Sequence, residues 1–394
     1  MPISQDNHAN SALIPIQEPD AGQTVASMAG TEAISAGEKL LFTTVKSVSG
    51  ASKHKKSELR SAKILLITIK ALANEVAKNL VLAGIGSLTI LDHEVVTEDD
   101  LCSQFLISEK DIGINRAQAA STALQNLNPR VKLYVDPSPI ANKPPNFVSN
   151  FDLVIATELD IETFSTINAA CRIAGKPFYC AASHGFYGFI FADLIQHDYV
   201  IEREKSNIPT EMKAETVTRS IIGITTKKEN NKIIELVTKR EIYSPIILAN
   251  TSPLPLEFVK SRRKRLQVPP LLSCLRALFD FQKLTPTHAL PSHTPHDLQT
   301  FTKLATEKHG ELQLPSETLR SEFLRSFLQN LGSELAPVTA FLGGTLAQDV
   351  INVLGGREQP LQNWLFFDGE DAKGPIYALH PIWVEGHPGT GAVV

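Results

Sequence analysis

The feature that most constrains this chain is a regular alternation of short apolar runs with segments of helical periodicity. Residues 63–67 form an apolar run typical of a buried strand. Residues 71–83 then carry apolar side chains at helical spacing, and Gly84 is a suitable C-cap. A second apolar run over 87–92 ends in Asp92. Strand–helix–strand units of this length favour parallel strands joined by a helical crossover.

The same alternation continues and returns near the C-terminus. The further expected elements are helices over 115–126, 160–174 and 334–356, and strands over 131–135, 151–156, 177–182, 363–369 and 375–379. We therefore predict an α/β fold with a doubly wound, mostly parallel sheet of Rossmann-like type and an inserted smaller helical subdomain.

Composition divides the chain into four regions. Residues 1–57 are rich in small and polar side chains, which predicts a disordered or poorly structured N-terminal region. Residues 58–204 carry the first part of the α/β core, and residues 326–394 carry the C-terminal part of the same fold. Between them, residues 205–325 lose the alternation and include a stretch rich in Pro, His and Thr. We expect an inserted helical subdomain with a flexible loop there.

Charge and cysteine usage narrow the function classes. The net charge is -4, so no global basic field favours nucleic acid or a membrane surface. No apolar run is long enough for a membrane span, and the first residues lack the apolar core of a signal peptide. The four cysteines form no paired metal-binding motif, and three histidines near residue 290 lie in a polar, Pro-rich loop. We expect no metal site, no nucleic-acid or membrane partner, and a reducing compartment.

The turn after the first expected strand has the layout of a dinucleotide-binding unit without its glycines. Such a turn uses glycine for a tight bend, for the approach of phosphate and for close helix packing. Here the three positions hold Thr68, Ala71 and Ala73, while Asp92 keeps the acidic position after the second strand. Added side chains strain the turn and fill the space of the phosphate oxygens. We predict a packed turn that binds no nucleotide; the alternative is a nucleotide site of unusual sequence.

Several segments resemble, in order and spacing, the activating enzymes for ubiquitin-like proteins, whose domain has the ThiF/MoeB-like fold. They are residues 59–67, 74–84, 91–94, 104–107, 111–117, 127–129, 183–188 and 334–344. The resemblance extends from residue 58 to about 380 and is weak between 205 and 325. In detail the chain resembles the regulatory, non-catalytic subunit of the heterodimer that activates SUMO.

This resemblance implies that the chemistry lies in the catalytic partner of a heterodimer. That partner would adenylate the C-terminal glycine of SUMO with Mg-ATP and carry it as a thioester for sumoylation, while this chain would bind no cofactor. Adenylating members hold the ATP phosphates with an Asn and an Arg before a Gln-Phe-Leu segment, but residues 97–104 contain three acids and no arginine. We also expect none of Cys102, Cys171, Cys180 and Cys274 to be a nucleophile. The chain is then a pseudo-enzyme with no catalytic residue of its own.

One segment departs from the family pattern. Members usually carry an arginine-containing segment before the first strand, and one of its arginines reaches the ATP bound by the partner. Here residues 39–56 take its place, and no arginine occurs before residue 60. Either this chain cannot supply the arginine, or residues 39–57 derive from a wrong gene model, such as translated intron.

Three other interpretations stay open at the level of sequence. The chain could be the regulatory subunit for another ubiquitin-like modifier, an autonomous MoeB/ThiF-like adenylyltransferase, or a nicotinamide-dependent oxidoreductase. The basic run at 260–265 indicates either a nuclear import signal or a solvated loop, and the family resemblance favours a nuclear protein. The apolar helix at 336–354 is either buried within the chain or part of a heterodimer interface.

Overall fold

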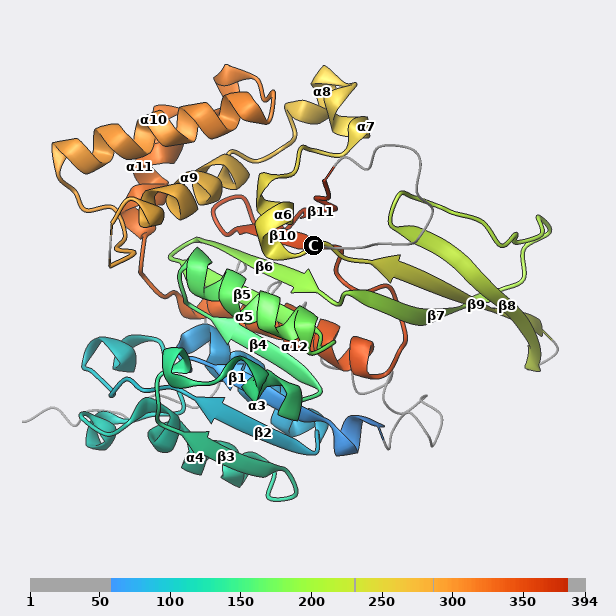
Figure 1. Ribbon diagram of the computed structural model, residues 1–394, viewed down its shortest axis with the longest axis horizontal. Helices are drawn as coiled ribbons and strands as arrows, with labels where there is room; N and C mark the ends of the chain where they lie inside the picture. Colours follow the sequence, from blue (N-terminus) through green and yellow to red (C-terminus); the bar gives the residue numbers. More distant parts are fainter. Residues whose placement is uncertain (1–57, 230–231, 286, 382–394) are drawn as a thin grey trace, which may run out of the picture.

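The computed structural model describes residues 58–381 except for 230, 231 and 286. Its main feature is an eight-stranded sheet with the order β11-β10-β6-β5-β4-β1-β2-β3 (Figure 1). The strands are β1 (Lys63–Ile67), β2 (Ser87–Leu91), β3 (Lys132–Asp136), β4 (Leu153–Thr157), β5 (Phe178–His184), β6 (Tyr187–Asp193), β10 (Trp364–Asp368) and β11 (Ile376–Tyr377). Strands β3, β2, β1, β4 and β5 are parallel, whereas β6, β10 and β11 join through antiparallel pairs. The predicted doubly wound, mostly parallel sheet is confirmed.

Helices cover both faces of this sheet (Figure 1). Helices α3 (Ala71–Ala83), α4 (Arg116–Leu127) and α12 (Ala336–Leu354) contribute to one core, and α5 (Ile161–Ile173) and α9 (Leu271–Lys283) contribute to the other. Because side chains alternate along a strand, Ile64 and Leu66 of β1 face the first core while Leu65 and Ile67 face the second. Burial on both faces explains why the strands are apolar at nearly every position.

The expected helices and strands of the core lie where the sequence placed them, within a few residues at each end. Strand β6 was not predicted, although all of its residues are buried. It follows β5 through a hairpin of only two residues, so the apolar run gave no sign of a second strand. The short 3₁₀ helices are η1 (Asp99–Cys102), η2 (Glu109–Asp111), η3 (Ile140–Asn142), η4 (Pro145–Asn150) and η5 (Ser316–Thr318).

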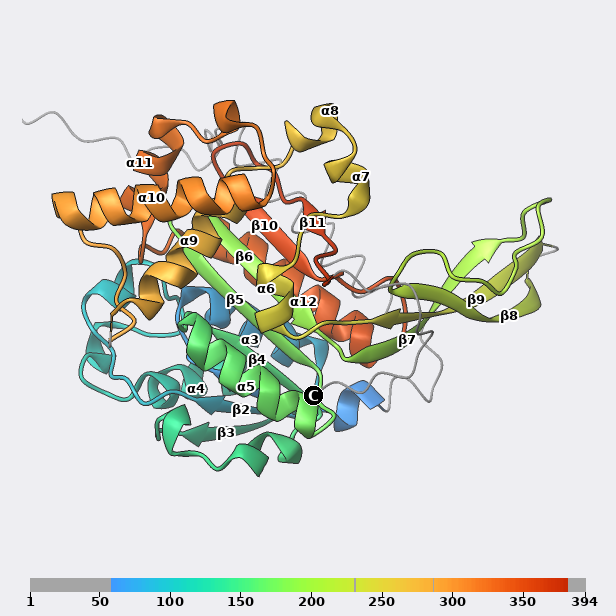
Figure 2. The same ribbon diagram turned by 45° about the horizontal axis from the view of Figure 1, so that its top comes forward.

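The segment 205–325, expected to be a helical subdomain, begins instead with two strands, and they pair with a third strand that lies within the region 58–204 assigned to the core. Strands β7 (Gln196–Glu204), β9 (Lys232–Ile242) and β8 (Arg219–Glu229) form a separate antiparallel sheet in that order, which projects from the main body in both views (Figure 2). The helical part comes afterwards, as α6 (Ile246–Thr251), α7 (Leu256–Val259), α8 (Arg262–Arg265), α9, α10 (Pro295–Glu311) and α11 (Ser321–Asn330). Cross-strand ion pairs such as Arg240 with Asp198 fill positions that are apolar in most strands, which hid the alternation.

Two other expectations concern the ends and the longest helix. The predicted disordered region, residues 1–57, lies outside the described residues. Helix α12 buries Leu342, Leu346 and Val350 but leaves Ala340 and Phe341 exposed, so it packs within the chain and still presents a surface. Among the described residues, no helix is both long and apolar enough to cross a membrane.

A nucleotide-type turn occupied by carboxylates

The turn between β1 and α3 lies at the carboxyl edge of the parallel strands, where open α/β sheets bind their ligands. Thr68 has a φ of 66°, a left-handed conformation that glycine adopts far more readily. Its N–H donates to the Leu91 carbonyl at 2.8 Å, and its carbonyl accepts from the Thr157 hydroxyl at 2.9 Å. The backbone therefore keeps the bend of a glycine turn although a threonine occupies it.

The two alanines of the turn lie in the core rather than on an open surface. Ala71 and Ala73 are both buried in the first turn of α3. The Ala71 N–H is one of the groups that a helix start leaves without an intrahelical partner. It donates to Oε1 of Glu334 at 3.2 Å, while Ser103 donates to Oε2 of the same carboxylate at 2.9 Å. A side chain of the protein thus takes the place where a bound anion would meet this helix.

Asp92 is buried, and each of its two carboxylate oxygens accepts two hydrogen bonds. Its Oδ2 accepts from the Ile69 N–H at 2.8 Å and from Nε of Arg116 at 2.9 Å. Its Oδ1 accepts from Nη2 of Arg116 at 3.2 Å and from the Glu94 N–H at 3.0 Å. The guanidinium of Arg116 also lies 3.5 Å from Asp100. The predicted acidic position is present, but an arginine from the start of α4 holds its carboxylate.

The acidic stretch at 97–104 also folds onto itself. Asp100 accepts from the N–H and hydroxyl of Thr97, both at 2.9 Å, and from the amide of Gln104 at 2.5 Å. Gln104 in turn accepts from Asn74 of α3 at 3.4 Å. These carboxylates and amides form a closed network beside the turn, and the cation in it, Arg116, is buried among them.

A second carboxyl group, Glu158, lies at the end of β4 close to Glu334. Burial, together with the nearby charge of Glu334, raises the pKa of Glu158 to about 8, against the lowering effects of its hydrogen bonds with Ser183 and of the charge of Lys70. Its Oε1 accepts from the N–H and the hydroxyl of Ser183, both at 2.9 Å. Glu158 is therefore mostly protonated at neutral pH, and the site holds one neutral acid beside one carboxylate.

This raised pKa predicts a pH-dependent stability. The folded state holds a proton on Glu158 that an unfolded glutamate releases near pH 4.5, so the free energy of unfolding falls as pH rises from about 4.5 to about 8. A Glu158→Gln variant keeps an oxygen for Ser183 and removes the titration. We expect its melting temperature to exceed that of the wild type by an amount that grows between pH 5 and pH 8.5. Equal differences at both pH values in thermal denaturation would contradict this assignment.

Three of the four cysteines are buried, and none is part of the network at this turn. Cys171, Cys180 and Cys274 are buried, and burial raises the pKa of each thiol, to about 12 for Cys171. Such thiols stay protonated at neutral pH and are weak nucleophiles. Cys102 is exposed at the end of η1.

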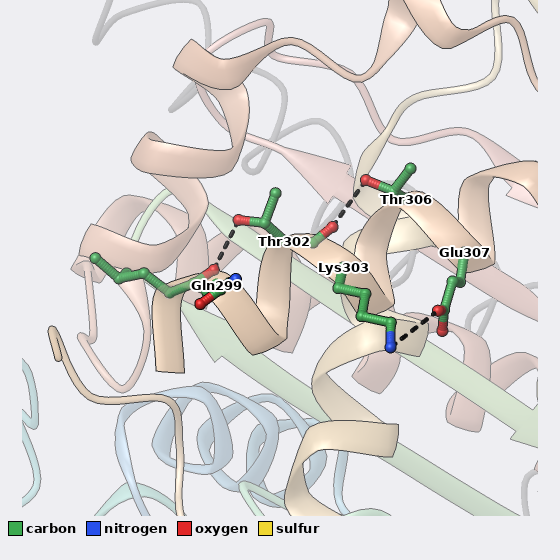
Figure 3. A pocket seen from close by; sticks show the side chains of 6 residues that line it. Gln299, Thr302, Lys303, Thr306 and Glu307 are labelled. Carbon is green, nitrogen blue, oxygen red and sulfur yellow. Dashed lines mark hydrogen bonds and ion pairs between the residues drawn. The ribbon is translucent and has the colours of Figure 1, made fainter. Parts of the chain in front are cut away.

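A shallow depression lies on the outer side of α10, but all of the side chains that line it come from that one helix (Figure 3). Most of its polar side chains already have partners: Thr302 and Thr306 donate to backbone carbonyls one turn earlier, and Lys303 lies 3.9 Å from Glu307. The depression therefore has no side chains converging from different elements. The turn at the sheet edge remains the candidate site.

Comparisons with known proteins agree with this geometry. The ThiF family matches residues 44–380. The chain is 34% identical to DNA damage tolerance protein RHC31 of Saccharomyces cerevisiae, over 82% of this chain and 91% of that protein. It is 33% identical to DNA damage tolerance protein rad31 of Schizosaccharomyces pombe, over 82% and 91%. It is 32% identical to SUMO-activating enzyme subunit 1 of Homo sapiens, over 82% and 90%. Because the family match spans the sheet, the turn and α12, and the relatives cover most of the chain, this chain belongs to the ThiF family.

Proposed function

We propose that this chain is the regulatory subunit of a heterodimeric SUMO-activating enzyme. The catalytic partner would bind Mg-ATP, adenylate SUMO and carry it as a thioester, and this chain would bind no nucleotide and supply the supporting half of the dimer. Support comes from the relatives named SUMO-activating enzyme subunit 1, which align along nearly their whole length. Nuclear localisation and contact with SUMO through the complex are further parts of this proposal.

The observation that carries the proposal is the contact between Glu334 and the start of α3. A triphosphate placed there would meet a carboxylate instead of free N–H groups, with Glu158 beside it. It would also meet the Cβ atoms of Thr68 and Ala71 at the turn. Like charges at such distances repel, and the cation that lies near this edge, Lys70, already interacts with Glu158. These residues do not suit ATP.

The same observation weighs against the other functions. An autonomous adenylyltransferase or a nicotinamide-dependent oxidoreductase needs an open phosphate site at this turn. A regulatory subunit for another ubiquitin-like modifier would share the occupied turn, so it remains the second candidate.

The exposed side of α12, around Phe341, is the surface we assign to the partner. The basic run is folded into α8, where Arg262 pairs with Glu317 at 2.6 Å and Lys264 with Glu257 at 2.6 Å.

Co-expression with the catalytic SUMO-activating subunit from the same source tests the proposal. ATP–pyrophosphate exchange with SUMO is measured for this chain, for the partner and for the purified pair. We expect the two chains to co-purify, the pair to exchange faster than the partner alone, and this chain to be silent. The same assay with a different ubiquitin-like modifier separates the two candidates. Failure of the chains to co-purify would overturn the proposal.

A further inference from the structure

The connection between β7 and β8, residues 205–218, is unusual in how much apolar surface it exposes. Ile208, Met212 and Val217 are 78%, 68% and 76% exposed. The segment lies beside the sheet that projects from the main body (Figure 2), away from the turn at the carboxyl edge. A partner can therefore reach it without contacting the core of the fold.

Lys213 lies in the middle of this segment with an accessible amine. Its side chain is 64% exposed, and its Nζ lies 3.2 Å from a carboxylate oxygen of Glu211, which is itself exposed. Ion pairs between exposed side chains contribute little free energy. The amine of Lys213 can therefore leave this partner at small cost.

The backbone around Lys213 is nevertheless held in place. Ala214 forms an antiparallel bridge with Ser220, and the Lys213 carbonyl accepts from the Ile221 N–H at 2.9 Å. Two residues on, the carboxylate of Glu215 accepts from Lys239 through both oxygens at 2.7 Å. The exposed Lys213 thus lies on a hydrogen-bonded backbone. The exposed side chain of Met212 precedes it, and the carboxylate of Glu215, held by Lys239, follows two residues later.

We propose that Lys213 is an acceptor site for SUMO on this chain, an inference that rests on the proposed function. An enzyme that transfers an acyl group to one lysine among many must recognise the side chains beside it. Met212 offers an apolar contact and Glu215 a charged one. Among the lysines in the described parts of the chain, Lys213 alone combines an aliphatic or methionine side chain before it with an acid two positions after it.

The chemical step uses a thioester between the C-terminal glycine of SUMO and a cysteine of a conjugating protein. The neutral amine of Lys213 attacks the thioester carbonyl carbon, and a C–N bond forms. The C–S bond breaks, and the cysteine sulfur leaves and takes up the proton that the nitrogen releases. The products are an isopeptide on Lys213 and a free thiol, so no oxidant, reductant or further co-reactant is needed.

The test uses the purified heterodimer and a conjugating protein already charged with SUMO by a separate activating enzyme. Modification of this chain is followed by gel shift and mapped by mass spectrometry of peptides. We expect one SUMO on Lys213, loss of that band in Lys213→Arg, and a weaker band in Glu215→Gln. Lys228→Arg is the matched control, because Lys228 is exposed on β8 of the same sheet, and it should behave as the wild type.

Two results keep this inference separate from the proposed function. ATP–pyrophosphate exchange by the heterodimer is measured on the same preparations, and we expect every variant to match the wild type. Because the conjugating protein arrives charged, a heterodimer without exchange can still be modified at Lys213. A band that persists unchanged in Lys213→Arg, or that maps to another lysine, would overturn the inference; so would the absence of any band in the wild type.

Discussion

An Arg116→Ala variant should lose about 3–5 kcal/mol of the free energy of unfolding, the usual cost of removing one partner from a buried ion pair. Arg116 and Asp92 are both nearly inaccessible, and the guanidinium makes two hydrogen bonds with the carboxylate. Without it, the charge of Asp92 stays buried beside Asp100 with no cation in contact. Urea denaturation followed by circular dichroism measures the loss.

Two further variants make this prediction specific. Arg116→Lys keeps a positive charge but loses the planar fork of donors, so its loss should be smaller. Arg130→Ala removes an exposed arginine shortly after the same helix and should change stability by less than about 0.5 kcal/mol. If Arg116→Ala is as stable as Arg130→Ala, the pair does not hold the start of α4 to β2. If Arg116→Ala does not fold, Arg116→Lys still reports the loss.

A Gly343→Ala variant should be destabilised by about 3 kcal/mol, near the upper end for forcing one extra carbon into a packed interior. A Cβ at this position would lie 2.5 Å from the Cβ of Glu75 and 2.8 Å from the Leu72 carbonyl oxygen of α3. Neither atom is the end of a flexible side chain, so α3 and α12 must move apart. The gain in helix propensity of about 1 kcal/mol is too small to offset this.

Gly344→Ala is the matched control, because it adds the same carbon to the next residue of α12. A Cβ at Gly344 meets no atom within 4 Å apart from its chain neighbours and the backbone of its own helix. We expect this variant to be neutral or to gain up to about 1 kcal/mol. Thermal denaturation of both variants in one buffer gives the comparison. Equal melting temperatures would mean that α3 and α12 do not cross closely at Gly343.

The sequence predicted the sheet well because both faces of it are buried. Each strand can therefore be recognised from its own apolar run, as at 63–67 and 87–91. Asp92 and Thr68 could be placed at the candidate site because they follow those runs directly. The projecting sheet was obscured because some of its cross-strand contacts are ionic, such as Arg240 with Asp198, so the apolar alternation of the strands is interrupted.

The partners inside the site were not predictable from the sequence. Glu334 meets the Ala71 N–H across 263 residues, and Arg116 meets Asp92 across 24. Such contacts depend on where α12 and α4 are placed by the whole fold, and no local pattern encodes them. The missing glycines indicated that the turn was altered, but they did not indicate that a carboxylate occupies the start of the helix. Arg116 lies in the segment 111–117 that carries the family resemblance, but nothing in that segment indicated its contact with Asp92.

If this chain supports adenylation without performing it, ATP–pyrophosphate exchange with SUMO must depend on the catalytic partner. We expect no exchange by this chain alone and a rate for the pair above that of the catalytic subunit alone. Exchange by this chain alone would contradict this expectation, because the turn occupied by Glu334 would then have to admit ATP.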